Sequence, residues 1–78
     1  MYVHELAVGE RAPDNVDLVV VTERRDGKFR FECVVWTEKG KAYFMADRRF
    51  ESAAEAKEAG LKWTEANGAQ TLFVEYRK

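Results

Sequence analysis

The stretch "SAAEAKEAGLKWTEANG", residues 52–68, decides the fold because it is the one strongly helical segment of the chain. Ser52 followed three residues later by Glu55 is typical of a capping box at a helix start, and Gly68 is typical of a helix end. One side of this helix is small, apart from a single tryptophan. That side carries Ala53, Ala56, Ala59, Gly60 and Trp63. We therefore expect the helix backbone to lie close to a sheet whose own side chains are large.

Strand-like runs lie on both sides of the helix. They cover residues 2–8, 16–25, 28–38 and 41–48 before it and 71–77 after it. Asp26-Gly27 and Lys39-Gly40 are turn signals between three of these runs. The pattern predicts an α+β fold of β-β-β-β-α-β order, in which one helix packs on one face of an antiparallel sheet of four or five strands. The 78 residues form a single domain, 1–78.

The turns also predict which side chains share a face of the sheet. A two-residue turn at Asp26-Gly27 puts Val20 opposite Cys33, and a turn at Lys39-Gly40 puts Glu32 opposite Asp47. The like-charge pair counts against the second register. The face under the helix would then hold Leu18, Val20, Phe29, Phe31, Cys33, Val35 and Phe44. The other face would hold Val19, Val21, Val34, Trp36, Tyr43 and Met45.

That second face is a candidate interaction surface, because it is too apolar to be left in water. Three things could cover it: the N-terminal segment that carries Tyr2, Val3, Leu6 and Val8, a second copy in a homodimer, or a partner protein. A further candidate contact lies on the outward side of the helix. It is formed by Leu61, flanked by the acidic residues Glu58 and Glu65.

Charge is unevenly distributed along the chain, although the formal net charge is only −1. Residues 24–49 carry eight basic and four acidic side chains. In residues 1–23 acidic side chains outnumber basic ones. An alternative function is therefore a small nucleic-acid-binding module that uses the basic end of the sheet. Its residues would be Arg24, Arg25, Lys28, Arg30, Arg48 and Arg49. Glu51 and Glu55, at the start of the helix, count against this alternative.

Catalytic chemistry has little support in the sequence. His4 is the single histidine, and Cys33 falls on the expected core face, where a thiol is packing. No Cys/His cluster has the spacing of a metal site, and no Gly-rich phosphate loop follows a strand. We expect neither an enzyme nor a bound cofactor.

The sequence also gives expectations about location. The longest apolar run, Leu18 to Val21, is far too short to span a membrane, and the first residues do not form a signal peptide. A single cysteine cannot form an internal disulfide, which fits a cytoplasmic location.

The stretch Phe50-Glu51-Ser52-Ala53-Ala54-Glu55-Ala56, followed by Gly60 and Trp63, resembles small bacterial and phage domains in which hairpins precede a helix. In its whole-chain character the protein is similar to phage-encoded inhibitors of the anti-CRISPR type. The resemblance covers the chain as architecture and transfers no site residue. It implies a non-catalytic module that binds a larger protein or protein complex and occludes a functional surface on it.

Overall fold

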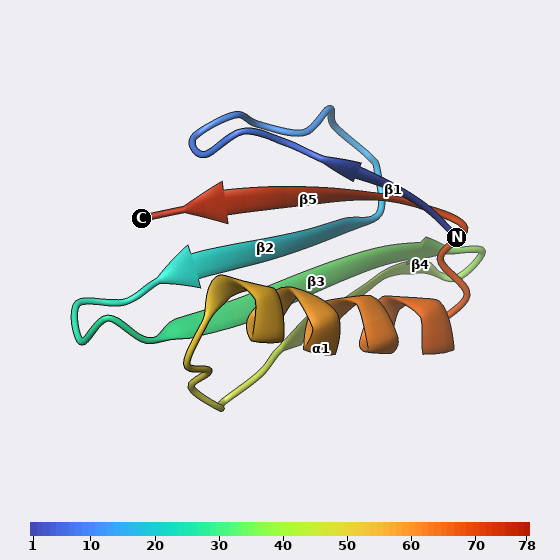
Figure 1. Cartoon of the computed structure of the whole chain (residues 1–78). Helices are drawn as coiled ribbons and strands as arrows, with labels where there is room; N and C mark the ends of the chain where they lie inside the picture. The colour runs from blue at the N-terminus through green and yellow to red at the C-terminus, as the bar shows by residue number, and fades with distance from the viewer.

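The computed structural model describes all residues from Met1 to Lys78 and shows one helix lying across one face of a five-stranded sheet (Figure 1). Its elements are β1 (Tyr2–Glu5), β2 (Leu18–Glu23), β3 (Phe29–Thr37), β4 (Gly40–Met45), α1 (Ala53–Ala66) and β5 (Thr71–Arg77). The predicted α+β class and the order β-β-β-β-α-β are confirmed. The single helix is too short and too polar to cross a membrane.

The sheet is mixed, which corrects the prediction of a purely antiparallel sheet. Its strand order is β1-β5-β2-β3-β4. The pairs β2–β3 and β3–β4 are antiparallel, whereas β5 runs parallel to both of its neighbours, β1 and β2. The physical reason is that α1 carries the chain back along the sheet after β4, so the next strand must run parallel to β4. β5 pairs with β1 and β2 inside the sheet and does not extend the meander beyond β4.

The helix begins and ends where the sequence predicts. Ser52 is the N-cap, and its hydroxyl accepts a hydrogen bond of 3.2 Å from the backbone N–H of Glu55. The last helical residue is Ala66, and Gly68 follows with a positive φ of 91°. A positive φ carries little steric cost at a glycine, which is why this residue stops the helix cleanly.

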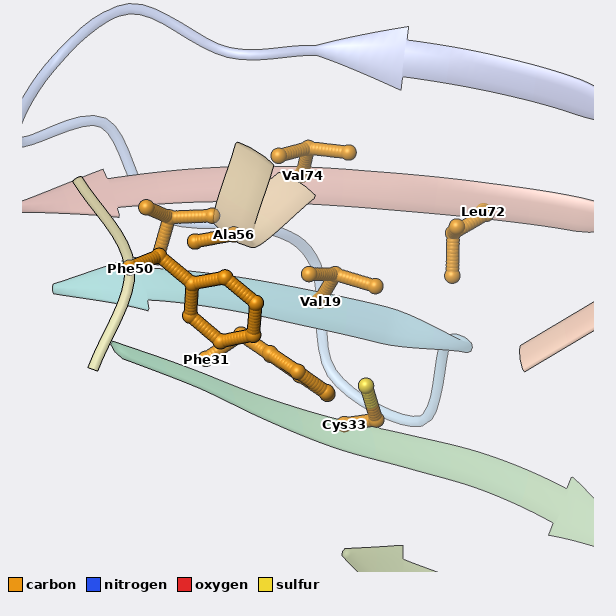
Figure 2. Close-up of a cluster of buried hydrophobic side chains, with 8 residues drawn as sticks. Val19, Phe31, Cys33, Phe50, Ala56, Leu72 and Val74 are labelled. Atoms are coloured by element: carbon orange, nitrogen blue, oxygen red, sulfur yellow. The ribbon is translucent and has the colours of Figure 1, made fainter. Parts of the chain in front are cut away.

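The small side of α1 lies directly on the sheet, as the sequence predicts. Ala56 and Gly60 are buried there, and a Cβ on Gly60 would come within 2.7 Å of Val19 Cγ1. Phe31 is buried on the same face, and the Phe44 ring stacks on Trp63 with 5.2 Å between ring centroids. Figure 2 shows Ala56 over the side chains from β2, β3 and β5 that form this core. The sheet therefore presents its large side chains to a helix that has almost none.

The β2–β3 register differs from the prediction by one residue. Arg24 N–H donates to Lys28 C=O over 2.7 Å, which leaves a three-residue loop in which Gly27 has a φ of 79°. Val19 therefore lies opposite Cys33, not Val20. Because neighbouring residues of a strand point to opposite faces, this shift reverses every side chain of β2. Val19 and Val21 lie under the helix, and Leu18 and Val20 lie on the other face.

The β3–β4 register differs by two residues, which leaves the predicted faces unchanged. The turn residues are Glu38-Lys39, so Thr37 pairs with Gly40. Glu32 then lies opposite Met45 and not opposite Asp47. The like-charge pair implied by the predicted register is thereby avoided. Trp36, Tyr43 and Met45 keep their predicted place on the face away from the helix.

Candidate interaction surface

The face of the sheet away from the helix is half covered by the chain that connects β1 to β2. The backbone N–H of Ala12 donates to Glu75 Oε2 over 2.8 Å, and Asp17 Oδ1 accepts a hydrogen bond of 2.8 Å from the backbone N–H of Trp36. Beneath this connection Val20 and Glu75 are buried, with 7% and 3% of their surface exposed. The part of the face formed by β3 and β4 stays open.

The covering segment is not the one that the sequence suggested. Residues 2–8 were expected either to fold over the second face or to extend the sheet. The second alternative is confirmed for Tyr2–Glu5, which form the edge strand β1. Val3 packs at the rim of the helix-side core, and Tyr2 and Val8 are exposed. Residues 11–17 cover the face instead. Because β1 and β2 are both parallel to β5 and lie on either side of it, the link between them must cross β5.

The open half of this face carries a group of large side chains that we call the aromatic patch: Val34, Trp36, Tyr43 and Met45. Val34 is half-buried, whereas Trp36, Tyr43 and Met45 have 43%, 53% and 45% of their surface exposed. Val34 pairs directly with Tyr43 across the β3–β4 ladder. The patch is thus one continuous surface on two adjacent strands.

Polar contacts hold the two aromatic rings of this patch in place. Tyr43 OH donates a hydrogen bond of 2.6 Å to Glu32 Oε2, and this bond raises the pKa of the tyrosine because it favours the protonated phenol. Lys41 Nζ lies 5.9 Å from the centre of the Trp36 ring, within cation–π range. Each ring thus has one polar contact within the protein although it faces solvent.

Of the other four predicted contact residues, the structure places Val19 and Leu61 differently, whereas Glu58 and Glu65 are exposed as expected. Val19 has no exposed surface, because the one-residue shift of the hairpin turns it under Gly60, so it is no part of a contact surface. Leu61 is half-buried and packs at the rim of the core, so it is not an outward contact. Glu58 and Glu65 are exposed on α1, but they do not flank an exposed leucine as the sequence suggested.

The basic residues at the hairpin end of the sheet divide into two sets. Lys28 and Arg49 are engaged by carboxylates, with 2.5 Å from Lys28 Nζ to Glu51 and 3.2 Å from Arg49 Nη1 to Asp26. The remaining four, Arg24, Arg25, Arg30 and Arg48, we call the arginine cluster. Arg30 reaches a carboxylate only at 3.9 Å, in Glu32, and the other three have none within 4.0 Å.

The arginine cluster adjoins the aromatic patch. Arg30 Nη1 lies 3.7 Å from Met45 Sδ, and the Arg48 guanidinium lies 4.9 Å from the centre of the Phe50 ring. Lys78 lines the same hollow as Arg24, Arg25 and Arg30. The position of Lys78 could not be predicted, because β5 was not expected beside β2.

The single cysteine and the single histidine both pack against neighbouring groups. Cys33 is buried, its thiol lies 3.7 Å from the carbonyl oxygen of Gly60, and burial raises the pKa of the thiol to about 12. His4 stacks on Phe73 with 4.7 Å between ring centroids. No group of three or more His, Cys, Asp or Glu side chains is placed to hold a metal ion.

No protein-family model matches the chain, and no curated protein or solved structure is significantly similar to it. The function is therefore inferred from the surface of this chain alone.

Proposed function

We propose that the chain is a non-catalytic protein-binding module and that the aromatic patch is its binding surface. The observation that carries the proposal is that Trp36, Tyr43 and Met45 lie together on the open half of the sheet, each with more than two fifths of its surface exposed. Trp, Tyr, Met and Arg are the residue types enriched at the centres of protein interfaces. All four occur here, since Arg30 contacts Met45.

Contacts within the protein favour one arrangement of the patch, which favours binding. Tyr43 is held by Glu32, and β3 pairs with strands on both sides. Ordering a side chain on binding costs roughly 0.5–1.5 kcal/mol, and much of this cost is avoided where the side chain is already fixed. We therefore expect the patch to bind a partner with little rearrangement of its own side chains.

The geometry of β4 adds a second means of contact. β4 lies at the edge of the sheet and has a neighbour on one side only, and five of its six residues are exposed. The backbone groups on its outer side are free to pair with a strand of the partner. Tyr43 and Met45 would lie on one side of that added strand and Phe44 on the other.

The resemblance to phage-encoded inhibitors suggests what this binding achieves. A small rigid domain with a flat aromatic face can cover a functional surface of a larger host protein without performing chemistry on it. We therefore propose occlusion of a larger protein or complex as the biological action, with Trp36 and Tyr43 as the anchors.

An affinity capture with matched variants tests the proposal. Wild-type protein, Trp36→Asp and Ala54→Asp are used as baits in bacterial lysate. Both substitutions place a carboxylate at an exposed position, on the patch and on the outer side of α1 respectively. We expect one large partner to be retained by the wild type and by Ala54→Asp and to be lost with Trp36→Asp. Equal retention by all three baits would show that the patch is not the binding surface.

Light scattering separates a foreign partner from a second copy. We expect the purified protein to be monomeric, and Trp36→Asp to have the same mass. A wild-type dimer that Trp36→Asp converts to a monomer would mean that the patch is covered by another copy of the chain. The proposal of a foreign partner would then fail.

A further inference from the structure

Arg24 has a side-chain nitrogen that is buried and has no partner. Its Nε is shielded from solvent and makes no hydrogen bond within the protein. A guanidinium is always charged and donates from five N–H groups, and buried donors are nearly always paired in folded proteins. Nε of Arg24 is therefore a donor for which the chain itself supplies no acceptor.

The surroundings of Arg24 are strongly basic. A cavity of about 200 Å³ lies between β3 and the segment after β4. Its polar lining consists of four guanidinium groups and one carboxylate, those of Arg24, Arg30, Arg48, Arg49 and Asp47. A second, shallower hollow is lined by Arg24, Arg25, Arg30 and Lys78, together with Thr22 and the acidic residues Glu23 and Asp26. Arg24 and Arg30 line both hollows and so occupy the centre of the basic region.

The nearby carboxylates do not pair with most of these basic groups, and two of them, Asp26 and Glu32, have other partners. Asp26 accepts a hydrogen bond of 2.9 Å from the backbone N–H of Lys28 and pairs with Arg49. Glu32 accepts from Tyr43 OH over 2.6 Å. Arg24, Arg25, Arg48 and Lys78 all lack a carboxylate within 4.0 Å. The local excess of positive charge is therefore available to an anion from solution.

We propose that Arg24, Arg30 and Arg48 form a binding site for a phosphate group. Phosphate is the anion that suits several guanidinium groups at once, because its oxygens accept parallel N–H bonds and it carries up to two charges. The phosphate can be borne on a small phosphorylated molecule or on a nucleic-acid strand. The site does not depend on the proposed protein partner, and it can exist whether or not the aromatic patch binds one.

The direct test observes Arg24 Nε itself. The side-chain Nε–Hε resonances of the arginines are followed by NMR while inorganic phosphate is added to the nitrogen-labelled chain. We expect the resonances of Arg24 and Arg30 to move together in a saturable way at millimolar phosphate. Chloride added at equal ionic strength should leave them in place. Resonances that do not move with phosphate, or that move equally with chloride, would overturn the proposal.

Variants then separate a built site from general attraction to a basic surface. Arg24→Gln should weaken phosphate binding by roughly tenfold, the usual effect of a lost charge-assisted hydrogen bond. Arg24→Lys keeps the charge but loses the fork of donors, so it should also weaken binding. Lys39→Gln removes one exposed charge at the opposite end of β3, roughly 20 Å away. Its effect should stay below about twofold, because that distance exceeds the screening length.

Equal weakening by Arg24→Gln and Lys39→Gln would show that phosphate is attracted only by overall charge, and the proposal would fail. Thermal unfolding of each variant checks that it is folded.

Two ligands distinguish the sources of the phosphate. Glycerol phosphate represents a small phosphorylated molecule, and a single-stranded oligonucleotide without terminal phosphates represents a nucleic-acid backbone. Tighter binding of the first at the Arg24 resonance supports a small-molecule ligand, and tighter binding of the second supports a nucleic-acid strand. Failure of both to move that resonance would overturn the proposal.

Discussion

Gly60 of α1 lies so close to Val19 of β2 that a Cβ on the glycine would come within 2.7 Å of Val19 Cγ1. The same Cβ would lie 3.3 Å from Phe31 Cδ2. The contact is between a helix backbone and branched side chains, with no flexible group that could move aside. The spacing of helix and sheet is thus set by the absence of a side chain at this position.

Gly60→Ala should destabilise the protein, although alanine is the better helix former. Helix propensity alone predicts a gain of about 1 kcal/mol, whereas overpacking of a core costs about 1–3 kcal/mol. We expect the free energy of unfolding, measured in urea, to fall. Ala54→Gly on the exposed side of α1 is the control, and it should cost only the propensity term, about 1 kcal/mol. A raised urea midpoint for Gly60→Ala would contradict the close approach.

Gly27 should tolerate asparagine much better than valine. Its φ of 79° is a left-handed conformation, and nothing lies within 4 Å of a Cβ placed there. Any cost of substitution therefore comes from the backbone and not from crowding. Left-handed backbone costs an ordinary residue about 1–2 kcal/mol and asparagine less. Urea denaturation of Gly27→Val and Gly27→Asn measures the difference, and equal stabilities would argue against the three-residue loop.

Glu5 should contribute to stability at neutral pH and lose that contribution in acid. Its pKa is lowered, first by the hydrogen bond from Tyr76 OH and then by the bond of 3.1 Å from Lys57 Nζ. A carboxyl whose pKa is depressed in the folded state stabilises above its unfolded pKa, here roughly 4.5, and the effect disappears as pH falls through the folded value. Because Glu5 is about half exposed, solvent screens the effect, so it should be small.

The comparison of wild type with Glu5→Gln isolates this effect. The urea midpoint of the wild type should fall further between roughly pH 5.5 and pH 3 than that of Glu5→Gln. Tyr76→Phe, which removes the main partner of the carboxylate, should reproduce part of the change. If the urea midpoints of all three proteins fell equally as the pH is lowered, Glu5 would not be the source of the acid sensitivity.

Cys33 should be unreactive in the folded protein. It has 1% of its surface exposed, and burial raises the pKa of its thiol to about 12, so the thiolate is scarcely present near neutral pH. A thiol reagent such as Ellman's reagent should react at once in urea and only slowly in native buffer. Fast, complete reaction of the native protein would contradict the buried position.

The helix and its packing could be predicted because the signals for them are local. Ser52 and Gly68 mark its ends, and the small side from Ala53 to Trp63 shows which face is buried. The places of Trp36, Tyr43 and Met45 were also predicted correctly. The predicted β3–β4 turn was wrong by two residues. Because a shift of two residues leaves every side chain on the same face, the predicted faces were still correct.

The orientation of β2 could not be predicted from its sequence. Residues 18–21 are apolar without a break, so they show no alternation that would indicate which face is buried. Asp26-Gly27 suits both a two-residue and a three-residue loop, and the choice between them reverses the strand. Val19 was assigned to the wrong face for this reason.

The central position of β5 was not apparent either. A strand that follows a helix can join a sheet at several places. The sequence of residues 71–77 does not indicate which strands will be its neighbours. The burial of Glu75 is a consequence of that placement and of the segment that crosses β5. The position of β5 and the burial of Glu75 depend on contacts between distant parts of the chain, which local sequence patterns do not predict.

The insertion of β5 between β1 and β2 constrains the order in which the chain can fold. The β2–β3–β4 meander and α1 are contiguous in sequence, so they can assemble early, during synthesis on the ribosome. β1 has no strand neighbour other than β5, and the two pair across the whole chain, with Tyr2 opposite Thr71. Until the final strand arrives, β1 and one side of β2 stay open to pairing with other chains. The protein should therefore be most prone to aggregation as a nascent chain that still lacks residues 71–77.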